Sequence, residues 1–87
     1  MISSEQLQRI AATVRARDLN EAMVSDLRTE YPDIHFTYCM EDDIPNHEPM
    51  LEAEGFNLYL VDGRDHCLCL TRNHEYASGI VIAEVLD

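Results

Sequence analysis

The chain contains no lysine, no tryptophan and only three glycines among its 87 residues. Without lysine there is no Schiff-base catalysis and no phosphate-loop lysine. The glycines are too scattered for a dinucleotide- or phosphate-binding loop, and no G-x-S-x-G nucleophile elbow is present. The 17 acids and four histidines could always supply an acid–base pair, so their presence carries almost no information. An enzyme acting on a small molecule in a pocket near the acidic segment is a further alternative. No motif predicts an enzyme, a cofactor or a catalytic residue.

Long apolar runs are also missing, since the longest spans a handful of residues and a bilayer requires roughly 20. The start "MISSEQLQRI" has no basic residues followed by an apolar stretch, so we expect no secretory signal. Three cysteines, an odd number, favour free thiols in a reducing compartment over a disulfide framework. These features together predict a cytoplasmic protein.

The net charge of −11 excludes nucleic acid and anionic membranes as expected partners, because both are bound through basic patches. The acids concentrate in residues 32–63, which hold eight acidic residues and no basic one. One interpretation is a solvated segment that keeps the protein soluble. The other is a docking surface for a basic protein, where the field of the acids would speed encounter.

Two helices are predicted at the start of a single domain of residues 1–87. Four apolar residues in "SSEQLQRIAATVRAR" follow a 3.6-residue period, and Ser3 with Gln6 has the spacing of a capping box. A second helix is expected to follow, capped by Asp18 and ended by Pro32. The apolar residues of the two helices are Leu7, Ile10, Ala11 and Val14, then Leu19, Met23, Leu27 and Tyr31.

The period then changes from 3.6 to 2, which is typical of strands. "DIHFTYCM" predicts a strand, and "EDDIPNHEPMLEAEG" predicts a loop with a short helical turn around 48–54. "FNLYLVDGRDHCLCLTR" predicts a β-hairpin with a tight turn at Asp62-Gly63. "GIVIAEVLD" favours a final strand over a helix because Ile and Val are β-branched.

The predicted fold is therefore α+β, with two N-terminal helices packed on one face of a four-stranded, mainly antiparallel sheet. Alternation sorts the strand residues onto two faces. The face under the helices would hold Ile34, Phe36, Tyr38, Phe56, Leu58, Leu60, Leu68 and Leu70. The other, mixed face would hold His35, Thr37, Cys39, Asn57, Tyr59, Val61, Cys67, Cys69 and Thr71.

The stretch "RDHCLCLTRNH" raises the question of a metal or redox site. If the strands were adjacent, Cys39, Cys67 and Cys69 with His35 could surround a zinc ion; a redox site would use the same thiols with His35 or His66. The C-x₂₋₄-C spacing of structural zinc sites is absent, and cysteine packs well as a small apolar residue. A packed strand without a metal is therefore the favoured interpretation.

The run "FTYCMEDDIP" followed by "EGFNLYLVDGRDHCLCLTRNHEYASGIVIAEV" resembles a family of small uncharacterised bacterial proteins. The similarity spans roughly residues 34–85 and follows an EDDIP…EGFNLYLVD…HCL-LT pattern. It implies no activity and no site residue, only a stand-alone bacterial domain.

The function expected from the residues is that of a non-catalytic binding or accessory module acting through protein–protein contact, with a basic protein or a second copy of the chain as partner. An antiparallel sheet can leave one face to solvent, and the mixed face suits a homodimer or a ligand. The expected interaction surface comprises Glu41, Asp42, Asp43, Glu48 and Tyr59. The alternative is the metal-binding or thiol-redox protein described above.

Overall fold

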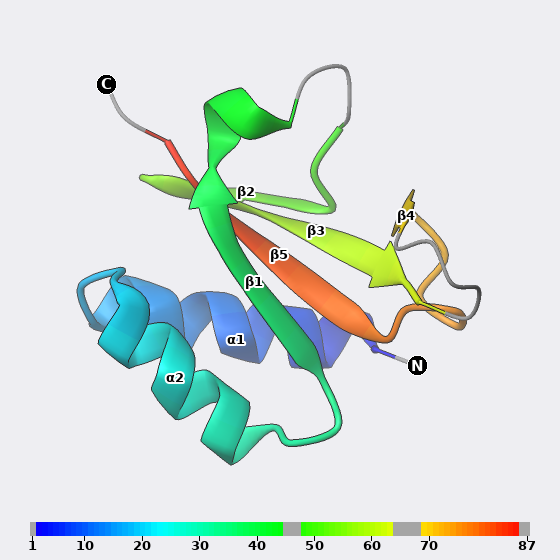
Figure 1. Cartoon of the computed structure of the whole chain (residues 1–87), viewed down its shortest axis with the longest axis horizontal. Helices are drawn as coiled ribbons and strands as arrows, with labels where there is room; N and C mark the ends of the chain where they lie inside the picture. The colour runs from blue at the N-terminus through cyan, green and yellow to red at the C-terminus, as the bar shows by residue number, and fades with distance from the viewer. Residues whose placement is uncertain (1, 45–47, 64–68, 86–87) are drawn as a thin grey trace.

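The computed structural model describes residues 2–44, 48–63 and 69–85, and these ranges contain two helices, a short 3₁₀ turn and a sheet (Figure 1). Both helices precede the strands in the chain, and both lie on the same side of the sheet (Figure 1). In chain order the elements are α1 Ser4–Ala16, α2 Glu21–Glu30, β1 His35–Met40, η1 Glu41–Asp43, β2 Leu51–Ala53, β3 Phe56–Asp62, β4 Cys69–Thr71 and β5 Gly79–Glu84.

Each helix begins at a side-chain cap. The Ser3 hydroxyl accepts a hydrogen bond from the Gln6 amide at 3.1 Å, which confirms the predicted start of α1. Helix α2 starts later than predicted, because Asn20 rather than Asp18 caps it by accepting from the Met23 amide at 2.9 Å. No helix among the described residues is long and apolar enough to cross a membrane.

The sheet confirms the α+β class but differs from the prediction in strand number and direction. It has five strands in the order β1-β5-β3-β2, with β4 also paired to β3. Strands β1 and β5 are parallel, whereas the other pairs are antiparallel. The fifth strand, β2, falls where a loop with a helical turn was predicted, because Leu51 pairs with Leu58 of β3.

The β3–β4 hairpin exists, but its predicted turn is wrong. Asp62 lies within β3 and pairs with Cys69, so the two strands are not joined by a two-residue turn at Asp62-Gly63. Most of the connection between them lies outside the described residues. The altered register places Leu70 opposite Val61, on the face away from the helices, and Cys69 on the opposite face. The predicted faces of these two residues are therefore exchanged.

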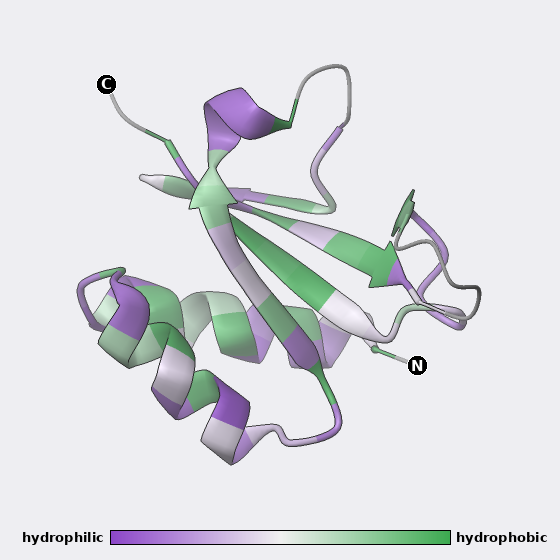
Figure 2. Cartoon of the chain, in the orientation of Figure 1, coloured by the Kyte–Doolittle hydropathy of each residue, from purple (hydrophilic) through white to green (hydrophobic). Residues whose placement is uncertain are grey.

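The main core lies between the helices and the nearer face of the sheet. Helical residues such as Ile10 and Val24 are fully buried against sheet residues such as Leu58 and Ile82. Hydrophobic residues accordingly dominate β5 and much of β3 (Figure 2). Burial of apolar area, at about 25 cal/mol per Å², is the main stabilising term of this layer.

Gly79, the first residue of β5, permits the close approach of β1. A Cβ atom at this position would lie 2.8 Å from the His35 carbonyl oxygen and 3.3 Å from the His35 Cβ. We expect Gly79→Ala to reduce the free energy of unfolding by about 2 kcal/mol, since β1 must shift to accept the methyl group. Urea denaturation would measure this change.

The control is Gly55→Ala, where the backbone φ is +88° but nothing lies within 4 Å of an added Cβ. Its cost is the backbone term alone, about 1 kcal/mol. A Gly79→Ala protein as stable as the wild type would show that the β1–β5 contact is looser than described.

Candidate functional site

The face of the sheet that points away from the helices is the candidate functional surface, and we call it the open face. The strand register brings Thr37, Val81 and Tyr59 into one row across β1, β5 and β3. Part of this face is nevertheless covered, because Tyr59 and Ala83 are buried in a small second cluster with Ile44 packed against it. No helix of the described residues covers the rest of the open face (Figure 1).

The covering element is the acidic segment, which we define as residues 41–50, with 45–47 outside the described residues. Its first residue is held by the sheet, since the Tyr59 hydroxyl donates to Glu41 Oε1 at 2.6 Å. Its far end is held by Arg72, whose Nη1 donates to the Glu48 carbonyl at 3.2 Å and lies 3.9 Å from Glu48 Oε2. The segment is thus attached to the sheet at both ends.

The open face contains a hydrogen-bonded pair of ionisable groups, Glu41 and Tyr59. Burial, together with the hydrogen bond to Glu41, raises the pKa of Tyr59 to about 12. The other carboxylate oxygen, Glu41 Oε2, is buried and has no hydrogen-bond partner among the described residues. Glu41 therefore depends on the Tyr59 hydroxyl as the donor that compensates for its removal from water.

The five residues of the predicted interaction surface differ in their exposure to solvent. Asp42, Asp43 and Glu48 are exposed and remain available to a partner. Tyr59 is only 2% exposed, so its side chain is not part of the accessible surface. Its function in the fold is to anchor Glu41, which is itself partly buried.

The candidate metal ligands that fall within the described residues are not brought together. Strands β1 and β4 are separated by β5 and β3, which places Cys39 about 14 Å or more from Cys69 at the usual strand spacing. His35 and Cys39 lie at opposite ends of β1, about 13 Å apart along an extended chain. In the described ranges no three Asp, Glu, His or Cys side chains are grouped to hold a metal ion. Cys67, His66 and His47 lie outside those ranges.

The environment of Cys39 opposes thiol chemistry. Burial, and then the charges of Asp43 and Glu41, raise the pKa of its thiol above the ordinary value. Reactive cysteines have the opposite property, a thiol pKa lowered by nearby cations or a helix N-terminus. Cys39 therefore behaves as a packed residue of the open-face cluster.

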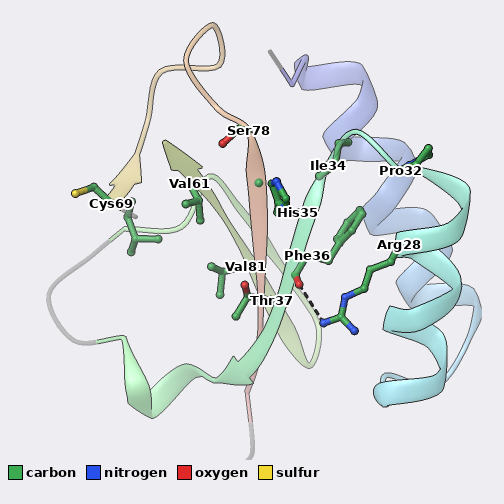
Figure 3. A pocket seen from close by; sticks show the side chains of 12 residues that line it. Arg28, Pro32, Ile34, His35, Phe36, Thr37, Val61, Cys69, Ser78 and Val81 are labelled. Atoms are coloured by element: carbon green, nitrogen blue, oxygen red, sulfur yellow. Dashed lines mark hydrogen bonds between the residues drawn. The ribbon is translucent and has the colours of Figure 1, made fainter. Parts of the chain in front are cut away.

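A groove occupies the uncovered part of the open face (Figure 3). Its volume is about 680 Å³, and its floor includes Val61, Leu70 and Val81. None of the described residues that line it is Asp or Glu, in a chain with 17 acids. Thr37 and His35 of β1 point toward the groove, whereas Phe36 points to the helix side (Figure 3).

Sequence reasoning missed this groove because it forms only when β5 lies between β1 and β3. Alternation along β1 and β3 did identify several of its residues, including His35, Thr37 and Val61. Its polar groups are hydroxyls, an imidazole, the Cys69 thiol and the Arg28 guanidinium, whose Nη2 donates to the Phe36 carbonyl at 3.1 Å. An apolar floor with a few polar groups around it is typical of a binding groove.

The raised pKa values predict a loss of stability at alkaline pH. Tyr38 donates to Glu84, and this bond together with burial raises its pKa to about 12, as for Tyr59. A folded-state pKa above the unfolded value of about 10 contributes stability that is complete below pH 10 and lost as the pH rises to 12. Urea denaturation between pH 8 and 12 would measure the loss.

Tyr59→Phe and Tyr38→Phe are the informative variants, since phenylalanine cannot ionise. Each should be less stable than the wild type at pH 8, by about 1 kcal/mol, because a carboxylate loses its donor. Each should also lose less stability than the wild type between pH 10 and 12. Variants whose pH profile runs parallel to that of the wild type would contradict the assignment.

Thiol kinetics would test the environment of Cys39. A protein with Cys67→Ser and Cys69→Ser retains only Cys39, and one with Cys39→Ala and Cys67→Ser retains only the exposed Cys69. We expect Cys39 to react with a disulfide reagent at pH 7.5 about tenfold or more slowly than Cys69, because the thiolate is disfavoured and shielded. Equal rates for the two proteins would show that the Cys39 side is open and unperturbed.

Comparison with known proteins places this geometry in a family but attaches no chemistry to it. No curated protein matches the chain, and no solved structure matches it. One family model, described as a family of unknown function (DUF6129), matches residues 7–85. The match runs from the first core residue of α1 to the residue after β5, so it contains every strand of the sheet. The chain therefore belongs to this family of unknown function, DUF6129.

Proposed function

We propose that this protein is a small non-catalytic binding module that acts through contact with another protein, and that the acidic segment docks a basic surface of that partner. The observation that carries the proposal is the attachment of the segment at both ends. Glu41 is held by Tyr59 and Glu48 by Arg72, while Asp42 and Asp43 remain exposed between these points.

Attachment matters because it reduces the entropy lost on binding. A charged loop that moves freely must be ordered by its partner, whereas a segment already held on a sheet presents its carboxylates in place. Four acids stand in this segment, and Arg72 is a basic residue that contacts it. Such a surface attracts a basic partner and increases the association rate more than the affinity.

A protein partner is favoured over nucleic acid or a membrane surface. The net charge of −11 repels both, because both are polyanions. Two of the six arginines are moreover paired with acids of the chain itself, Arg9 with Glu5 and Arg17 with Asp26. The odd number of cysteines, three, supports a cytoplasmic location for this contact.

The test compares two triple variants with equal net charge. One neutralises the segment with Asp42→Asn, Asp43→Asn and Glu48→Gln. The other neutralises exposed acids elsewhere with Glu30→Gln, Glu54→Gln and Glu75→Gln. Proteins retained from a lysate of the source organism by immobilised wild type would be quantified against both variants at low and high salt.

We expect the segment variant to lose at least one retained protein and the control variant to keep it. Three removed charges at about 0.5 kcal/mol each correspond to an affinity about tenfold weaker. Retention should also fall with salt for the wild type. Equal retention by the two triple variants would mean that the segment is a solvated surface without a docking role.

A further inference from the structure

Strand β1 lies at one end of the strand order, so one of its two edges is not paired with a described strand. The His35 amide donates to the Ser78 carbonyl, and the register pairs His35 with Gly79 of β5. In a parallel pair the residues that bond to the neighbouring strand alternate, so the backbone groups of Phe36, Tyr38 and Met40 point away from β5. Arg28 of α2 reaches this edge, since its Nη2 donates to the Phe36 carbonyl.

This edge lacks most of the devices that prevent strands from pairing between molecules; the exception is Arg28 of α2, which must release the Phe36 carbonyl before a second strand can bond to it. Natural edges are shortened, bulged or lined with lysine, proline or inward-pointing charge. The opposite side of the sheet follows this rule, because β2 and β4 have three residues each. Strand β1 has six residues, HFTYCM, without proline, glycine, carboxylate or lysine.

We propose that a second copy of this chain pairs with β1 through the same strand, antiparallel, so that two sheets join into one across a two-fold axis. The inference goes beyond the proposed function, because it concerns the edge of β1 and a second copy of the chain, whereas the proposed function concerns the acidic segment and a basic partner. Antiparallel pairing of identical strands is self-complementary, and the resulting interface closes as a dimer instead of extending into a filament.

The distribution of charge selects both the surface and the orientation. Two chains of net charge −11 repel each other, and the groove beside β1 is a surface whose described lining contains no carboxylate. The acids Glu41–Asp43 directly follow β1, whereas Arg28 and His35 lie toward its start, with Asp33 nearby. Parallel pairing would set the two acidic clusters side by side. Antiparallel pairing places the acidic cluster of each copy next to the start of β1 in the other copy, where Arg28 and His35 lie.

The side chains along this edge also favour pairing. Thr37 and His35 are exposed on the open face, and Tyr38 and Met40 are partly exposed on the other. Aromatic and β-branched residues placed opposite each other on neighbouring strands stabilise a sheet by about 0.2–1 kcal/mol per pair. The groove would then run beside the joined strands and be narrowed by the second copy.

Sedimentation velocity of the full chain from 1 to 500 µM, in about 0.15 M salt, tests the proposal. Thr37→Lys places a charge on the exposed face of the edge strand, a substitution that blocks edge pairing. Thr13→Lys on α1 is the matched control, with the same residue change and the same net charge. We expect a dimer for the wild type and for Thr13→Lys, and a dissociation constant raised by about tenfold or more for Thr37→Lys.

Amide hydrogen exchange provides the second measurement, because it reports the edge itself. The outward-pointing amides of Tyr38 and Met40 should exchange more slowly as the protein concentration rises through the dissociation constant, while the exposed amides of α1 do not change. A monomer at every concentration would overturn the proposal and leave the docking role of the acidic segment standing. A dimer that tolerates Thr37→Lys, or that leaves these amides unprotected, would place the interface elsewhere and overturn it as well.

Discussion

The insertion of β5 between β1 and β3 is the constraint on which the rest of the structure depends. β5 is the last strand of the chain, yet it is the central one, paired along six residues with β1 and with β3. Its alternating side chains supply both clusters, with Ile80 and Ile82 under the helices and Val81 and Ala83 on the open face. Gly79 permits the insertion, since a side chain there would meet the backbone of β1.

Because β5 lies between β1 and β3, these two strands do not contact each other. This insertion moves β1 to the edge, leaves one side of that strand unpaired by any described strand, and keeps Cys39 away from Cys69. It also forms the floor of the groove from strands that are distant in sequence. The same strand order that separates the described cysteines thus generates the edge at which we propose that a second copy pairs.

The Tyr59–Glu41 bond links the charged surface to the sheet. A carboxylate partly removed from water requires a donor, and the buried tyrosine provides one while its ring packs in the open-face cluster. The free energy lost by desolvating Glu41 is offset by this bond and by the burial of the ring. Consequently the neighbouring acids are held at the surface, where they can act on a partner without each requiring a contact of its own.

The sequence alone determined the helices, the strand periodicity, the α+β class and the concentration of acids in the middle of the chain. These are local properties, set by side-chain spacing, capping residues and composition. It did not reveal β2, since a strand of three residues, Leu51–Ala53, carries too short an alternation to be distinguished from a loop. The register of β4 was also missed, because the Asp62-Gly63 dipeptide suggested a turn that pairing with Cys69 overrides. The tertiary structure alone decided the strand order, the burial of Tyr59, the groove and the exposed edge of β1. The reason is that each of these depends on which distant segments lie side by side, and alternation along one strand contains no information about its neighbours.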